Sequence, residues 1–327
     1  MTEILSLAAG NMISPIILCF VLGMSAALAR SDLTIPEAVA KGMSIYLLFA
    51  IGFKGGAGVA EHGIDARLAA ALTSGALLSL SLPFIAYTLL GALTRLDTVD
   101  KAAVAAHYGS ISIVTFVAAS SVLESQGISS EGYMVAVAAV MEAPAILSAL
   151  WIVARSGGQG IADTRLYREI LLNGSIVLLV GAFLIGAITG EKGLETISPF
   201  MVLPFQGVLC LFLMDMGLVA GRGLRDHRAA LRGGAILFGL AMPLVGSAFG
   251  LLAGYLVGLS SGGTALLMTL AASASYIAVP AAMRVALPEA RPAVYLTLSL
   301  GVTFPFNLAV GIPVYTAVAS MIAGGPS

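Results

Sequence analysis

The chain has 327 residues, of which 59% are hydrophobic and only 10% are charged, and its formal net charge is −1. A soluble domain carries about 25% charged residues, so this chain lacks the polar side chains that a water-facing surface needs. The composition therefore predicts an integral membrane protein and gives no indication of nucleic-acid binding. The opening residues MTEILSLAAGNM contain no Lys or Arg, so a cleaved signal peptide is not expected.

A membrane-spanning helix needs about 20 apolar residues. Ten such segments follow one another, which predicts an all-α protein with spans at 12–30, 37–53, 68–94, 99–124, 130–154, 168–190, 196–221, 229–258, 263–286 and 292–323. The Gly-rich, polar connection at 156–167 is interpreted as a cytoplasmic linker. It divides the chain into two halves of five spans, residues 1–155 and residues 168–327.

Positive charges fall mostly on one side of these spans. The opposite side carries only Lys54, Arg67 and Lys192. By the positive-inside rule the richer side is cytoplasmic, which places both termini outside the cell. We therefore expect a multi-pass protein of a bacterial plasma (inner) membrane.

The two halves resemble each other in sequence. Pro83 in LSLSLPFIAY corresponds to Pro243 in FGLAMPLVGS. Three further pairs keep the same order at an offset of about 160 to 165 residues: AIGFKGG with DMGLVAG, SISIVTFVAAS with SASYIAVPAAM, and MEAP with VTFP. Four pairs in register indicate a duplicated five-span unit. Because five is an odd number, the second copy enters the membrane inverted, as in many secondary transporters.

Small polar residues interrupt the fourth and ninth spans near their middles. Ser110 and Ser112 lie in the first interruption, and Ser273 and Ser275 in the second. Non-helical backbone is tolerated in a membrane only where protein or water satisfies it, so two broken helices are expected to meet there. The N–H groups that begin the second half-helices, together with nearby hydroxyls, suit a small anion, and the freed carbonyls suit Na⁺. The alternative is that these small residues serve only helix packing.

These segments resemble the sodium-dependent bicarbonate transporter family over nearly the whole chain. The resemblance rests on residues 35–56, 109–124, 141–147 and 271–295. It implies an inverted five-plus-five fold with a core domain and a gate domain, assembled as a homotrimer. It also implies an anion at the meeting point of the broken helices, in a substrate and ion region that contains Gly109, Ser110, Ser112, Thr115, Glu142, Ser273, Ser275 and Tyr276. Na⁺ is assigned to Glu142, Ser112 and Ser275.

The sequence departs from the cyanobacterial members of that family in three places. Tyr276 stands where they carry an Asp, and its hydroxyl either donates to the anion or closes the floor of the cavity. Ile113 and Val114 replace small and hydroxylic residues. The segment between the halves is short, so a PII-like regulatory partner is not expected.

Other polar residues lie within apolar segments. An acid at such depth is a functional candidate. Glu142 is interpreted as a Na⁺ ligand or coupling carboxylate, or as a protonated acid bonded to a neighbouring helix, and Asp215 as a structural hydrogen bond or a gate contact. His107 either makes transport pH-sensitive or is satisfied by a neighbouring carbonyl, which we favour. Asn307 is expected to bond a freed carbonyl at the kink of Pro305.

Several residues receive a structural interpretation. Lys54 is explained by snorkelling at the external end of the second span. Gly217 and Gly221 form a small-xxx-small pair for helix packing. Cys19 and Cys210 are treated as packing residues, with neither a disulfide nor a metal implied.

No nucleophile–base pair, P-loop or HExxH motif is present in the sequence, so an enzyme is not expected. Na⁺ serves as the coupling ion, and no organic cofactor is implied. The sequence thus predicts a Na⁺-coupled symporter that imports bicarbonate. The alternatives are a Na⁺-coupled transporter of another small anion, such as a short carboxylate, and an anion channel or sensor without coupling.

Overall fold

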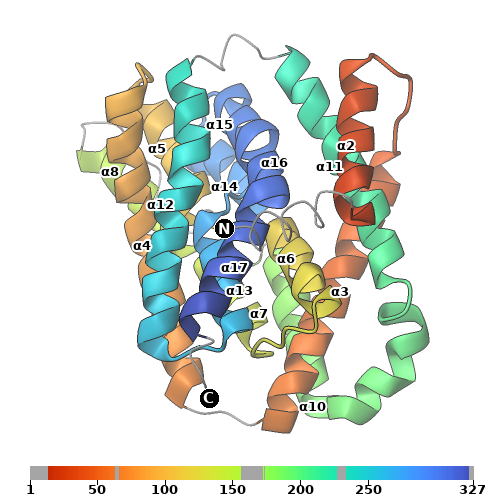
Figure 1. The fold of residues 1–327 in the computed structure, drawn as a ribbon. Helices are drawn as coiled ribbons and strands as arrows, with labels where there is room; N and C mark the ends of the chain where they lie inside the picture. The colour runs from red at the N-terminus through yellow and green to blue at the C-terminus, as the bar shows by residue number, and fades with distance from the viewer. Residues whose placement is uncertain (1–13, 63–65, 156–171, 173, 227–232, 324–327) are drawn as a thin grey trace.

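The computed structural model describes residues 14–62, 66–155, 172, 174–226 and 233–323. Every regular element in these ranges is helical (Figure 1). The first half contains α2 Pro15–Leu28, α3 Glu37–His62, α4 Ala66–Leu93, α5 Thr98–Gly109, α6 Ile113–Ser125, α7 Met134–Met141 and α8 Pro144–Arg155. The predicted linker at 156–167 lies outside the described residues.

The second half begins with α10 Gly174–Met201, α11 Phe205–Asp226, α12 Gly233–Val257, α13 Ser261–Ala272 and α14 Ala278–Ala286. Its last span changes helix type repeatedly, through α15 Pro292–Leu298, the π-helix η2 Ser299–Thr303, α16 Phe304–Phe306, the π-helix η3 Asn307–Gly311 and α17 Ile312–Ala323. Eight helical segments in the described part are long and apolar enough to cross a membrane. Two shorter apolar helices, α2 and α13, accompany them. The chain is therefore a multi-pass membrane protein.

Two predicted span boundaries are wrong. The second span was expected to end at residue 53, but α3 continues to His62. The seventh was expected to begin at residue 196, whereas α10 extends to Met201 and α11 begins at Phe205. The predicted end of the sixth span at residue 190 coincides with Gly190, whose φ of 60° and ψ of −153° are non-helical and bend the chain between two helical stretches of α10. The residues from 196 to Met201 belong to the second of these stretches and not to α11. Figure 1 shows this bend in the light green helix.

Four helices form one group in the fold. α2 packs along α11 and α3 along α10, and Figure 1 shows the four on one side of the molecule. Glycines permit this close approach: a Cβ at Gly217 would overlap the Phe20 carbonyl, and one at Gly221 would lie 2.7 Å from the Met24 carbonyl oxygen. The predicted packing role of this pair is confirmed. Cys19 and Cys210 are free thiols that interact across the same α2–α11 contact.

The second group contains the remaining helices, with the fourth span at its centre. The apolar stretch of Thr98–Ser125 is buried along its whole length, whereas that of Ile176–Met201 is only 17% buried. α10 is therefore the least enclosed of these spans, whereas the interrupted helix pair α5 and α6 is surrounded by protein. This enclosure lets non-helical backbone exist at membrane depth.

Candidate functional site

The fourth and ninth spans are each interrupted by a short extended segment. α5 ends at Gly109 and α6 begins at Ile113, while α13 ends at Ala272 and α14 begins at Ala278. The residues that follow α5 and α13 have almost the same backbone conformation, with φ −84° and ψ −177° at Ser110 and φ −86° and ψ 165° at Ser273. The interruptions thus lie at the predicted Ser-x-Ser positions.

The two interruptions are hydrogen-bonded to each other. The Ser112 N–H donates to Ser273 Oγ at 2.8 Å. In the opposite direction, the Ser275 N–H donates to the His107 carbonyl at 2.8 Å. The segment that follows α13 thus binds backbone groups both of the first extended segment and of the last turn of α5, which meets the requirement for non-helical backbone at this depth.

The four serines of these segments are between 1% and 3% exposed, but their hydroxyl groups differ in role. Ser110 Oγ donates to the Glu142 carbonyl at 3.0 Å, and Ser273 Oγ donates to the Leu270 carbonyl at 2.9 Å. These two hydroxyl protons are committed to the framework. In contrast, Ser112 Oγ accepts from the Thr115 N–H at 3.2 Å and Ser275 Oγ from the Val279 N–H at 3.4 Å. Ser112 is the N-cap of α6, and Ser275 binds the N–H of the second residue of α14, whose N-cap is Ile277.

Two more hydroxyls lie buried beside the first cap. Thr115 Oγ1 and the Tyr276 hydroxyl have no hydrogen-bond partner of good geometry within the described protein. The Tyr276 phenol lies beside the Ser112 side chain, and its ring packs edge-on against Phe304 at 5.5 Å. A buried hydroxyl without a partner is costly. Both groups are therefore available to a polar ligand that enters the break.

Glu142 lies in a third helix interruption, between α7 and α8. Pro144 has no N–H, and the Ser79 hydroxyl of α4 bridges the gap by donating to the Met141 carbonyl at 2.6 Å and accepting from the Ala145 N–H at 3.2 Å. The Glu142 carbonyl binds Ser110, so the backbone of this residue contacts the first break. Its side chain is buried and has no ion-pair partner in the described part of the chain.

His107 and Asn307 stabilise the ends of the first half-helices. His107 Nδ1–H donates to the Ala103 carbonyl at 2.6 Å, which confirms the favoured interpretation, and its ring stacks on Tyr295. Asn307 Nδ2 donates to the Ala272 carbonyl at 2.9 Å. It thus bonds a freed carbonyl, as predicted, but the carbonyl ends α13 and does not belong to the kink of Pro305. The reason is that π-helical turns close the backbone on both sides of that proline.

The second acid that the sequence places deep in an apolar span does not join the site. Asp215 is buried on α11, and Arg222 on the same helix is the charge that acts on it. No hydrogen bond from Asp215 to another helix is found within the described residues. Its role as a gate contact stays a prediction.

Each broken helix is hydrogen-bonded to the opposite half of the chain through one carboxylate. Asp100 in the first turn of α5 accepts from the backbone N–H of Arg291 at 2.9 Å and from its Nε at 2.6 Å. Glu131, in the α6–α7 connection, accepts from the Ser260 N–H at 2.7 Å and from Ser260 Oγ at 2.9 Å, at the start of α13. Both acids are present in the sequence, but no sequence pattern indicates which residues they bind.

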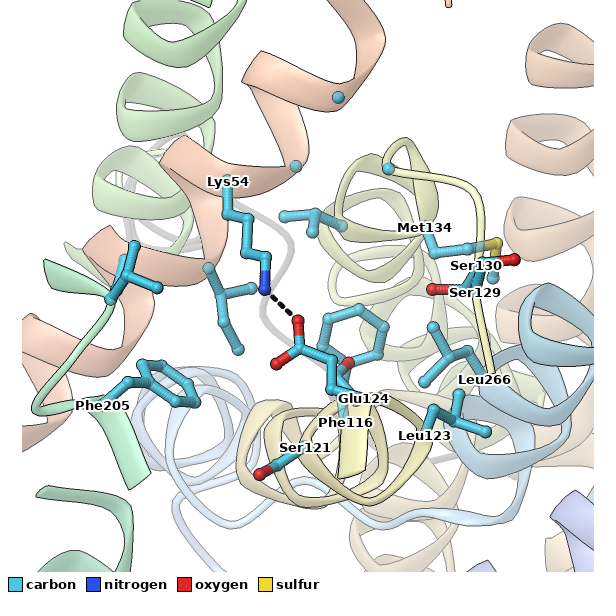
Figure 2. Close-up of a pocket in the computed structure, with 18 of the residues that line it drawn as sticks. Lys54, Phe116, Ser121, Leu123, Glu124, Ser129, Ser130, Met134, Phe205 and Leu266 are labelled. Atoms are coloured by element: carbon cyan, nitrogen blue, oxygen red, sulfur yellow. Dashed lines mark hydrogen bonds and ion pairs between the residues drawn. The ribbon is translucent and has the colours of Figure 1, made fainter. Parts of the chain in front are cut away.

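A cavity of about 550 Å³ opens between the two helix groups. Figure 2 shows Lys54 of α3 and Glu124 of α6 directed toward each other within it, joined as an ion pair. Phe116 also lines the cavity and lies one helical turn beyond Ser112, to whose carbonyl its N–H is bonded. The cavity thus ends about one turn short of the first break.

The interpretation of Lys54 as a snorkelling side chain at the end of a helix is wrong. α3 continues for two more turns beyond this residue, and the ammonium group pairs with Glu124 in the cavity instead of extending past a helix end. Glu124 itself was not a candidate in the sequence. A single acid at the end of the fourth span gives no signal that it faces a cavity.

A comparison with protein-family models matches residues 15–320 to the Na⁺-dependent bicarbonate transporter superfamily. The chain belongs to this family. No curated protein matches the sequence. Family membership agrees with the resemblance inferred above, and it makes the chain a transporter of the Na⁺-dependent bicarbonate class and not an enzyme.

Proposed function

We propose that this member of the family is a symporter that imports bicarbonate with Na⁺ across a bacterial plasma membrane. The observation that carries the proposal is the reciprocal pairing of the two interruptions through Ser112 with Ser273 and Ser275 with His107. It brings the N-terminal ends of α6 and α14 together in buried surroundings. The first N–H groups of a helix have no intrahelical acceptor and favour an anion.

Within this site the residues have separate roles. Ser112, Ser275, Thr115 and Tyr276 bind the bicarbonate oxygens, because their hydroxyl protons are not donated to the backbone. Ser110, Ser273 and Gly109 hold the shape of the break: a Cβ at Gly109 would overlap the Pro83 ring. The Glu142 carboxylate, with Ser112 and Ser275, binds Na⁺ as the transported cation.

The helix groups supply the moving parts in this proposal. α2, α3, α10 and α11 form the gate domain, and the helices around the two breaks form the core domain, each derived from both five-span repeats. The pairing of the first helix with α11 and of the second with α10 is the reciprocal exchange that two inverted repeats produce. Alternating access then consists of movement of one group against the other.

The free energy of the Na⁺ gradient limits how far a given number of Na⁺ ions per bicarbonate can concentrate the anion. A tenfold Na⁺ gradient supplies about 1.4 kcal/mol per ion, so electroneutral one-to-one symport concentrates bicarbonate about tenfold. Accumulation beyond that requires a second cation. A channel or sensor needs no Na⁺ at all, and Na⁺ dependence separates these classes.

The test is uptake of labelled bicarbonate into proteoliposomes, with an inward Na⁺ gradient or with choline in its place. We expect Na⁺-dependent uptake that falls at least tenfold in a Ser112→Ala/Ser275→Ala variant. Ser81→Ala is the matched control, since the Ser81 hydroxyl bonds only to the Leu78 carbonyl of its own helix. Uptake without Na⁺ dependence contradicts symport. Uptake of acetate in preference to bicarbonate identifies a short carboxylate as the substrate, with the Tyr276 hydroxyl as the candidate donor to it.

A further inference from the structure

The cavity between α3 and α6 lies on the face that the charge distribution assigns to the outside of the cell. Its lining comes from both helix groups, with Lys54 from α3, Glu124 from α6 and Phe205 from the start of α11. Figure 2 shows that Lys54 and Glu124 point into the same open space. An anion from outside therefore meets these side chains before it reaches the buried break beyond Phe116.

Lys54 is the only cationic side chain among the described residues that line this cavity. Of the two acids there, Glu131 is committed to Ser260 through two hydrogen bonds. Glu124 is paired only with Lys54 in the described structure. The net electrostatic attraction of the cavity for an anion therefore depends on whether the Lys54 ammonium is neutralised by Glu124.

The Lys54–Glu124 ion pair is weak enough for its partners to exchange. The Lys54 and Glu124 side chains are 48% and 50% exposed, and an ion pair in such solvated surroundings contributes little net stability. Glu124 also occupies the last turn of α6, where the helix dipole disfavours a negative charge. Another carboxylate-like anion can therefore replace it at the ammonium group with a small free-energy change.

We propose that Lys54 is an anion-capture residue at the entrance of the transport path and that Glu124 is its internal competitor. Bicarbonate displaces the Glu124 carboxylate from the Lys54 ammonium, waits in the cavity and then enters the break. When it leaves, Glu124 pairs with Lys54 again. This inference rests on the proposed function, because it concerns how the same anion reaches the site.

The inference predicts opposite effects for two substitutions that both destroy the ion pair. Lys54→Gln removes the capturing charge and raises the KM for bicarbonate about three- to fivefold, the value of one screened charge interaction. Glu124→Gln removes the competitor and lowers the KM about twofold by the same reasoning. The maximal uptake rate changes little in either variant. Lys54→Arg keeps the charge and the wild-type KM.

The experiment measures the KM and maximal rate of Na⁺-driven bicarbonate uptake in proteoliposomes for these variants. Lys192→Gln is the matched control, since Lys192 is an exposed lysine on α10 that does not line the cavity. The Lys54→Gln/Glu124→Gln double variant should reproduce the KM of Lys54→Gln, because Glu124 acts only through Lys54. Monodispersity in detergent verifies that each variant is folded.

Two results overturn the inference while leaving symport intact. One is a KM that moves in the same direction in both single variants, which identifies the pair as a structural link. The other is a KM that Lys54→Gln does not change. Absence of uptake by the wild-type protein instead overturns the proposed function, and the inference with it.

Discussion

The Ser112 N–H and Ser273 Oγ are joined by a hydrogen bond of 2.8 Å, although 161 positions separate the two residues in the chain. Both are buried and therefore shielded from bulk water. Ser273 also donates to the Leu270 carbonyl and so connects the first break to the end of α13. We call the place where the two interrupted spans are hydrogen-bonded to each other the crossing. Its geometry depends on Ser273 more than on any other of these serines.

Ser273→Ala should therefore destabilise the protein. It leaves the Ser112 N–H buried without an acceptor, which costs about 1–3 kcal/mol. Thermal unfolding in detergent should show a lower midpoint than for the wild type. Ser110→Ala is the control, since it removes one donor and leaves the crossing bonds in place. An equal loss in both variants contradicts a special role for Ser273.

The Asp100–Arg291 link should be worth more than its surface position suggests. Asp100 is only 2% exposed and accepts two hydrogen bonds from Arg291, so Asp100→Asn should cost about 2 kcal/mol. The hydrogen bond and charge of Asp100 raise the pKa of Arg291 above its usual value. Since even the usual pKa of arginine lies far above mildly alkaline pH, the guanidinium stays charged, and the loss should be equal at neutral and mildly alkaline pH.

The neighbouring acid provides the control for that measurement. Asp97 caps α5 by accepting from the Asp100 N–H at 2.8 Å. Because Asn caps helices as well as Asp does, Asp97→Asn should change stability by less than about 0.5 kcal/mol. Denaturant or thermal unfolding of both variants decides between a specific link at Asp100 and a general effect of negative charge at this helix end.

Gly263→Ala should break the corresponding link on the opposite membrane side. The added Cβ would overlap the Glu131 carboxylate that Ser260 holds. We expect a loss of about 1–3 kcal/mol in unfolding stability. In a Glu131→Ala background the overlap is absent, so the same glycine substitution should then cost much less. Additive losses in this double-mutant cycle would show that the two residues act independently.

Glu142→Gln should weaken Na⁺ coupling more than anion binding. The substitution keeps the size of the side chain and removes the charge that we assign to the cation. The Na⁺ concentration for half-maximal bicarbonate uptake should rise at least tenfold. Asp215→Asn neutralises the other buried membrane acid, and it should leave that concentration unchanged. If the two variants behave alike, Glu142 does not bind the transported cation.

The positions of the two breaks could be predicted because Ser-x-Ser pairs interrupt apolar spans at equivalent places in both halves, which helix packing alone does not explain. The serine and asparagine candidates therefore lie at or beside the crossing. Which serine hydroxyls donate to the backbone and which accept from it could not be predicted, because this depends on the backbone group that each hydroxyl reaches. The partner of Ser110, for example, is the backbone of Glu142, not its carboxylate.

Other features left no trace in the residue pattern. Residues 55–62, GGAGVAEH, look like a loop, yet they are helical, and their glycines pack against α10 at Gly56 and against Gly132 and Val135 at Gly55. Likewise, the π-helical turns around Pro305 have no sequence signature, and they redirect Asn307 to another helix.

The crossing of the two breaks also constrains how the protein is made. The Ser112 N–H needs an acceptor that the ribosome adds 161 residues later. At about 5–20 residues per second, that acceptor arrives roughly 10–30 s afterwards. During this interval the fourth span is an interrupted helix without its partner. Biogenesis therefore depends on a temporary shelter for this span, in the translocon or among its earlier neighbours, until the second half is inserted.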